Sequence, residues 1–177
     1  PRIIYASISG FGSTGPYSKE PCVDPVAQAM GGLMSMTGYP GQAPLKTGPA
    51  IADSMAGMNL AIAITGALYM REKTGLGQRV EVAMMDTVFA VLEEAVIRTS
   101  MTGEPLGARG NTDPLGAPWD AFETADGRWI MVCGVGGDKF YQIYSEIGRS
   151  DIAEEYKGDG EAQIERRSAE LGYLNSV

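Results

Sequence analysis

One stretch constrains the fold more than any other: a long apolar run, residues 53–73, has a single carboxylate at its head. Ala, Met, Leu, Ile and Gly fill most of the run behind Asp53, and the next acid, Glu72, comes where the apolar residues have ended. The composition predicts a buried helix from Asp53 to about Lys73, closed by the glycines of the TGLGQ turn. Its apolar part, Met55–Met70, is shorter than the roughly 20 residues that a bilayer span requires, so we expect no membrane partner.

The carboxylate of Asp53 has two interpretations. Asp is a preferred helix N-cap, and an acid at that end also suits the helix dipole. Alternatively, Asp53 is a nucleophile whose small neighbours, including Ala52, Ser54 and Gly57, leave room for a thin substrate. Backbone N–H groups of the first turn could then stabilise an oxyanion. The residues themselves leave both interpretations open.

The pattern around this run predicts strands alternating with helices. A buried strand is expected over Ile3–Ile8, and a short helix is expected to start at Asp24, as its cap, with Pro25 in its first turn. Residues 78–84 alternate as a strand does, and a further helix is expected from Asp86 to about Met101. This order indicates α/β architecture for the first part of the chain.

A change of texture separates a second part. Residues 104–118 are rich in Gly and Pro and are predicted to link residues 1–103 to residues 119–177. Beyond this linker, two strands are expected around an Asp126-Gly127 turn, followed by an amphipathic helix in GGDKFYQIYSEIG and a partly helical tail. The second part is therefore expected to be a small α+β domain.

Charge and composition exclude several classes of function. The net charge is −8, from 22 acids and 14 bases, so a nucleic acid or an anionic membrane is not expected as a partner. Cys22 and Cys133 lie far apart, which favours free thiols in a reducing cytosol over a disulfide or a zinc site. The chain has no histidine, which removes the commonest general base and metal ligand. We therefore expect a cytoplasmic protein without a bound metal or cofactor.

Three blocks in consistent order resemble the family III CoA-transferases: SISGFGSTGPY, DPVAQAMGGLMSMTG and the long segment from GPAIADSMAG through REKTGLGQ to VEVAMMDTV. The resemblance covers most of residues 1–101 and continues more weakly through APWDAFETADGRWI. It implies that residues 1–103 are the central part of the family's large α/β domain and that residues 119–177 are part of its small domain.

The resemblance also implies a reaction. In these enzymes an aspartate at the start of such a helix attacks an acyl-CoA thioester, and Asp53 occupies that position. The attack gives a mixed anhydride and CoA thiolate, and the thiolate then forms an aspartyl-CoA thioester from which a carboxylic acid takes the CoA. The expected partners are accordingly an acyl-CoA and a carboxylate, with the coenzyme A thioester as substrate.

Other positions acquire roles from the same resemblance. Asp24 matches an acidic position in the active site, where a catalytic role stands beside the interpretation as a helix cap. Gln28, Gly31 and Gly32 match a segment near the substrate, although the two glycines also suit tight packing. With Ser54 and Gly57, which flank Asp53, these three are the candidates for substrate or CoA binding.

The alternatives are a non-catalytic module and an acyl-CoA racemase. The related racemases use a histidine in the upstream segment, and none occurs around Asp24, which favours a transferase. Full-length members of the family are roughly twice as long, larger than a typical single domain, so we expect this chain to correspond to a central portion. Because two chains of the family interlock like linked rings, a homodimer or higher homo-oligomer is expected.

Overall fold

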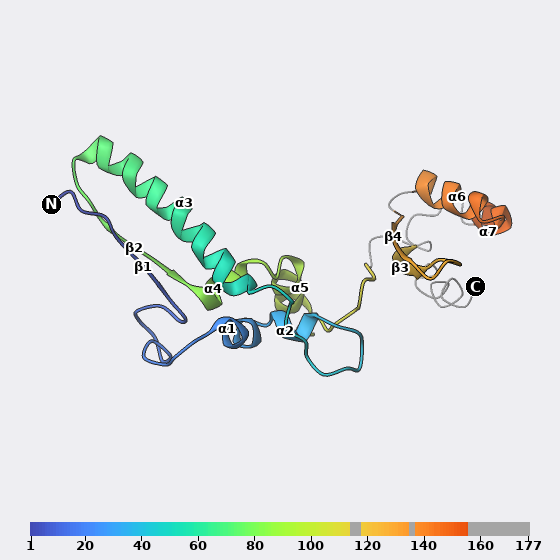
Figure 1. Ribbon diagram of the computed structural model, residues 1–177, viewed down its shortest axis with the longest axis horizontal. Helices are drawn as coiled ribbons and strands as arrows, with labels where there is room; N and C mark the ends of the chain where they lie inside the picture. The colour runs from blue at the N-terminus through green and yellow to red at the C-terminus, as the bar shows by residue number, and fades with distance from the viewer. Residues whose placement is uncertain (114–117, 135–136, 156–177) are drawn as a thin grey trace. The chain divides into compact units, whose positions relative to one another are not determined.

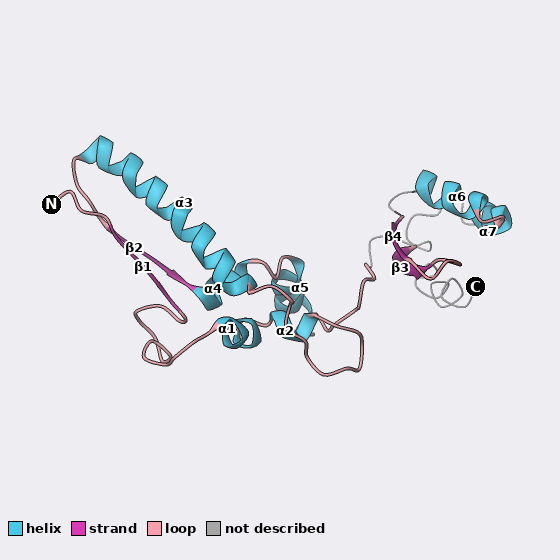
Figure 2. Cartoon of the chain, in the orientation of Figure 1, coloured by secondary structure: helices cyan, strands magenta, loops and turns pink. Residues whose placement is uncertain are grey.

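The computed structural model describes residues 1–113, 118–134 and 137–155. The chain forms two compact units, Pro1–Ala108 and Arg109–Val177. Their boundary lies inside the 104–118 segment that the sequence predicts as a linker, and the linker itself stays a prediction. Figure 1 shows the order of the elements, and Figure 2 shows which are helices and which are strands.

The first unit is built around a parallel pair of strands, β1 (Tyr5–Ser9) and β2 (Arg79–Ala83). The register pairs Tyr5 with Arg79 and Ser9 with Ala83, so both strands end at the same edge. Helix α3 (Ile51–Thr74), the last element before β2 in the chain, packs along both strands, as Figure 1 shows. The prediction of a buried first strand is wrong for this chain: Tyr5 and Ile8 are exposed, because the sheet has only two strands in the described residues and α3 is the main element packed against them.

Helix α3 confirms the predicted long helix and ends at Gly75, whose φ of 76° is the left-handed conformation that glycine adopts readily. Its predicted burial is wrong for this chain. Three alanines of α3 are buried, whereas Met58, Ile62 and Tyr69 are more than 60% exposed. The physical reason is that α3 carries apolar side chains all round its circumference, while the described chain covers only one side of the helix.

At 24 residues, α3 is also longer than the apolar run counted in the sequence. By length and mean hydropathy alone it would suffice to cross a membrane, a criterion that core helices of soluble proteins also meet. The sequence-based reason for excluding a membrane, a run too short to span one, therefore does not hold for the whole helix.

Two helices that the sequence predicts as continuous are interrupted. The first divides into α1 (Asp24–Met30) and α2 (Leu33–Met36) at Gly32, whose φ is 92°. The second divides into α4 (Met84–Ala90) and α5 (Glu94–Thr102). The interruption there is Glu93, the only non-glycine residue with positive φ in the described part of the chain, at 48°.

The core of the first unit is small and lies where α1, α3 and α4 meet. Its buried members are small or medium-sized apolar side chains that allow the three helices to approach closely: Ala27, Ala52, Ala56, Met84 and Val88. This core holds the first turn of α3 against α1, and that contact positions the site described below.

The second unit contains an antiparallel hairpin of β3 (Trp119–Glu123) and β4 (Trp129–Cys133), followed by α6 (Gly137–Glu146) and α7 (Ser150–Glu155). The hairpin confirms the turn predicted at Asp126-Gly127, where Gly127 has a φ of 77°. The tail expected to be partly helical begins in α7, and its remainder lies outside the described residues.

Candidate active site

The start of α3 lies at the edge of the sheet where both strands end. β1 leads directly into Gly10, whose carbonyl accepts a hydrogen bond from the Met85 N–H at 3.0 Å, just after β2. Figure 1 shows the first turn of α3 beside the start of α4, and the two helices are in contact. Ligands of open α/β sheets bind at the carboxyl ends of the strands, so Asp53 occupies the edge where a substrate is expected.

Asp53 does not cap its own helix. Ala50 is the N-cap residue of α3, and its own side chain makes no capping hydrogen bond. Asp53 is the third residue of the helix, its side chain is exposed, and its carboxylate accepts no hydrogen bond from the described residues. The interpretation of Asp53 as a helix cap is therefore wrong, and its carboxylate is open to solvent.

Asp24 stabilises the start of α3 instead. Its Oδ1 accepts a hydrogen bond from the Ala52 N–H at 2.8 Å, across 28 residues of sequence, while the side chain is only 7% exposed. The N-cap of its own helix is Val23, without a side-chain bond, so the expectation that Asp24 caps α1 is also wrong. Asp24 therefore binds an N–H at a helix start, as aspartate commonly does, but the helix is α3 and not its own helix α1.

Gln28, one turn further along α1, completes this arrangement. Its Nε2 donates to Asp24 Oδ2 at 2.7 Å, and its Oε1 accepts from the Thr47 N–H at 2.9 Å. The side chain is completely buried. The Thr47 hydroxyl also donates to Oε1 at 3.2 Å, so Gln28 fixes the loop that precedes α3.

Cys22 lies close to both aspartates. Burial raises the pKa of its thiol, and the negative charges of Asp53 and Asp24 raise that pKa further. A hydrogen bond from the Ala27 backbone lowers the pKa and so opposes these effects in part. A Cβ added to Gly10 would lie 2.0 Å from the Cβ of Cys22, so glycine is required where β1 ends. Cys22 and Cys133 are both free, as the sequence predicts.

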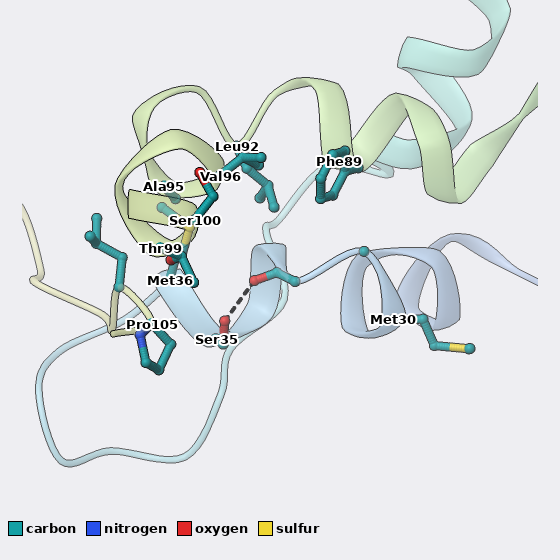
Figure 3. A pocket seen from close by; sticks show the side chains of 13 residues that line it. Met30, Ser35, Met36, Phe89, Leu92, Ala95, Val96, Thr99, Ser100 and Pro105 are labelled. Atoms are coloured by element: carbon teal, nitrogen blue, oxygen red, sulfur yellow. Dashed lines mark hydrogen bonds between the residues drawn. The ribbon is translucent and has the colours of Figure 1, made fainter. Parts of the chain in front are cut away.

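Gly31 and Gly32 have structural roles that their geometry explains. A Cβ on Gly31 would lie 2.6 Å from Val88 Cγ1, and Gly32 has positive φ. Both glycines line a mainly apolar hollow of about 400 Å³ between α1–α2 and α4–α5, together with Phe89 and Leu92. Figure 3 shows this hollow, with the Ser35 hydroxyl donating to the Gly32 carbonyl at 2.7 Å.

Ser54 and Gly57 lie on α3 next to Asp53 and both are exposed. A Cβ on Gly57 would meet nothing within 4 Å, so open space surrounds it in the described structure. This space agrees with room for a ligand, and binding roles for Ser54 and Gly57 stay predictions.

The structure therefore gathers Asp53, Asp24 and Gln28 at the start of α3, and places Gly31 and Gly32 at the far end of α1. Sequence reasoning missed Thr47 and the amide of Ala52, because contacts across 19 and 28 residues leave no local pattern. In the described residues, no group of three or more His, Cys, Asp or Glu side chains is placed to hold a metal ion.

Comparison with known proteins shows the family to which the chain belongs. A family model described as CoA-transferase family III matches residues 1–174. The acetyl-CoA:oxalate CoA-transferase of Acetobacter aceti is 38% identical over 86% of this chain and 39% of its own length. The succinyl-CoA:mesaconate CoA-transferase of Haloarcula marismortui is 36% identical over 95% of this chain and 43% of its own.

A solved structure agrees. The crystal structure of a CAIB/BAIF family protein from Brucella suis matches 99% of this chain with a TM-score of 0.82 and 33% identity, and the match covers 47% of that chain. The chain described here thus spans less than half the length of these relatives.

Proposed function

Because the chain belongs to CoA-transferase family III, we propose that it takes part in moving CoA between an acyl-CoA and a carboxylic acid, with Asp53 as the nucleophile. The relatives named above transfer CoA from acetyl-CoA or succinyl-CoA to a dicarboxylic acid, which makes small carboxylates the first acceptors to test.

The observation that carries the proposal is the difference in hydrogen bonding between the carboxylates of Asp53 and Asp24. Asp53 is exposed and accepts no hydrogen bond from the described residues, whereas Asp24 is buried and binds the helix amide that a capping residue would bind. A nucleophile requires an oxygen that can reach its substrate. Asp53 satisfies that requirement.

In the proposed first step, a carboxylate oxygen of Asp53 attacks the carbonyl carbon of the thioester. The C–S bond breaks, and the electron pair leaves with sulfur as CoA thiolate, so that a mixed anhydride joins Asp53 to the acyl group. The thiolate then attacks the aspartyl carbonyl of the anhydride, which releases the donor acid as a carboxylate and leaves Asp53 as its CoA thioester.

The acceptor repeats the sequence in reverse. Its carboxylate attacks the aspartyl thioester, CoA thiolate leaves again, and the thiolate finally attacks the acceptor's carbonyl in the new anhydride. The products are the acceptor's CoA thioester and a regenerated Asp53 carboxylate, with no net gain or loss of protons. A carboxylate is a weak nucleophile, so positioning of the reactants must supply much of the barrier reduction.

The first turn of α3 offers a donor for the oxyanion that forms at each attack. The Ala52 N–H is bound to Asp24 and the Ser54 N–H to the Ala50 carbonyl at 3.1 Å. The N–H of Asp53 has no hydrogen-bond partner in the described residues. Backbone donors aimed at a developing negative charge contribute strongly to acyl transfer.

A second candidate is a non-catalytic module that retains the fold for binding or assembly. The observation in its favour is length, since the chain spans 39–43% of the transferases it resembles. An assay of covalent chemistry at Asp53 separates the two functions.

The test is intact-mass spectrometry of the 177-residue chain after incubation with acetyl-CoA or succinyl-CoA. We expect a CoA or acyl adduct that hydroxylamine removes, and peptide mapping should place the resulting hydroxamate on Asp53. Asp53→Ala should abolish the adduct. Asp86→Ala is the matched control, because Asp86 is also an exposed aspartate at the third position of a helix. A folded chain that takes no label would favour the binding module.

A further inference from the structure

We infer that Asp24 is a positioning residue: it fixes the first turn of α3, and through it the carboxylate of Asp53, without itself reacting. This inference rests on the proposed function of Asp53. The set formed by Asp24, Gln28, Thr47 and Ala52 is called the Asp24 latch below.

The latch holds α3 on both sides of its N-cap. Gln28 accepts from the Thr47 N–H at 2.9 Å, three residues before Ala50, and Asp24 accepts from the Ala52 N–H at 2.8 Å, two residues after it. Ala52 directly precedes Asp53 in the chain. A movement of the Ala52 amide therefore displaces the Asp53 carboxylate with it, and displacements of about 1 Å can slow an enzyme by about 100-fold.

Both oxygens of Asp24 are committed to this arrangement. Oδ1 binds the Ala52 N–H and Oδ2 binds Gln28 Nε2 at 2.7 Å, and the residue is 7% exposed. A group that abstracts a proton or attacks a substrate needs an oxygen within reach of that substrate. Of the two aspartates, Asp53 alone has such an oxygen in this structure.

The donor and acceptor pattern of the latch has one consistent orientation. A carboxylate only accepts, so the amide nitrogen of Gln28 must face Asp24. The amide oxygen of Gln28 then faces the Thr47 N–H, which only donates. The pattern therefore runs as an unbroken chain from Thr47 through Gln28 and Asp24 to Ala52.

Asp24→Asn interrupts this chain. If the new amide keeps its oxygen toward Ala52, its nitrogen faces the nitrogen of Gln28, and two donors oppose each other. If Gln28 turns over, its nitrogen faces Thr47. The Thr47 hydroxyl, 3.2 Å from the present amide oxygen, can accept from that nitrogen while it donates to the Pro49 carbonyl, but the Thr47 N–H then loses its acceptor. One donor therefore stays unsatisfied in either case, buried between positions 24 and 28 or half-buried at Thr47, and that is costly.

The double variant Asp24→Asn with Gln28→Glu restores the pattern. The asparagine oxygen accepts from Ala52, its nitrogen donates to the new carboxylate at 28, and that carboxylate accepts from Thr47. Shape and net charge are those of the parent, but no carboxylate remains at position 24. A positioning role survives this exchange, whereas a direct chemical role of Asp24 does not.

The experiment measures the rate of adduct formation at Asp53 with acetyl-CoA or succinyl-CoA, in parallel with NMR hydrogen exchange of the Ala52 and Thr47 amides. Asp24→Asn should slow labelling by about 100-fold and accelerate exchange at Ala52 or, if Gln28 turns over, at Thr47. The double variant should return the rate to within about tenfold of the parent, since a neutral oxygen accepts more weakly than a carboxylate. It should also restore slow exchange.

Two results would overturn the inference. One is a double variant that regains slow exchange at Ala52 but labels as slowly as Asp24→Asn, which would assign the chemistry to the carboxylate of Asp24. The other is Asp24→Asn with unchanged exchange at both Ala52 and Thr47. Failure of the proposed function looks different, because the parent itself would then take no label, and the exchange measurements would still decide whether the latch holds α3.

Discussion

Gly31→Ala should destabilise the first unit through a single steric contact. The added Cβ would lie 2.6 Å from Val88 Cγ1 and 2.8 Å from the Ala27 carbonyl oxygen, well inside van der Waals contact. Gly31 has φ of −77° and ψ of −6°, which alanine adopts without strain, so the backbone adds no penalty. Forcing one extra methyl into a close-packed site costs about 1–3 kcal/mol. The smaller entropy of the unfolded alanine chain offsets about 0.4–1 kcal/mol of that.

The assay is urea unfolding of the full chain, followed by circular dichroism, with Gly66→Ala as control. Gly66 lies within α3, and a Cβ there meets nothing within 4 Å, so this variant should gain about 1 kcal/mol of helix propensity. The two free energies of unfolding should therefore differ by about 2 kcal/mol, with Gly31→Ala the less stable. The steric reasoning fails if Gly31→Ala unfolds at the same urea concentration as Gly66→Ala or above it.

Three further predictions concern other parts of the chain. Glu93→Gly should stabilise the protein by about 1 kcal/mol in urea unfolding, because glycine tolerates the φ of 48° between α4 and α5, and no change would refute strain there. Alkylation of Cys22 should require a higher pH in the folded chain than in urea, because burial and then the charge of Asp53 raise its pKa above 9.0. Asp53→Asn should lower the pH that alkylation requires, and an unchanged pH profile would show that the charge of Asp53 does not act on Cys22. The hydrogen bond from Arg128 holds the pKa of Asp126 below 3.8, so Arg128→Gln should raise that pKa in an NMR titration, and a constant value would contradict the contact.

The two pKa shifts act on stability with opposite signs. The folded-state pKa of Cys22 is raised, so its contribution to the free energy of unfolding is present below pH 9.0 and is lost as the pH rises through the folded value. The folded-state pKa of Asp126 is lowered, so its contribution is present above pH 3.8 and is lost as the pH falls through the folded value. Unfolding measured at both extremes checks the two signs.

Local pattern predicted the elements that local forces determine. The long apolar helix and its glycine stop, the second strand of the parallel pair and the hairpin at Asp126-Gly127 all follow from periodicity and turn chemistry, and all are confirmed. The interruption at Glu93 was missed because glutamate is an ordinary helix residue, and nothing in its neighbours indicates positive φ.

The site was predicted less completely, for a related reason. The resemblance to a family directed attention to Asp53 and Asp24, but propensity assigned each to the cap of its own helix. The observed bond from the Ala52 amide to Asp24 joins residues 28 positions apart, and such a bond depends on how α1 and α3 pack. The predicted burial of β1 and α3 is also wrong, because an apolar sequence indicates that a segment tends to be buried but does not identify what packs against it.

Asp24, and not Asp53, makes the capping bond of α3, so under the proposed mechanism the group that stabilises the helix is not the group that reacts. Active-site groups commonly reduce the stability of the fold, so that a change which improves activity often lowers stability, and the reverse. Here Asp53 contributes no side-chain hydrogen bond to the described fold, and Asp53→Asn removes at most the favourable placement of one charge at a helix start, about 1 kcal/mol. Under the proposed mechanism, that variant is a substrate trap: it keeps the shape of the site, admits the thioester and cannot turn it over. Position 53 and its exposed neighbours are likewise open to redesign without loss of the framework that holds them.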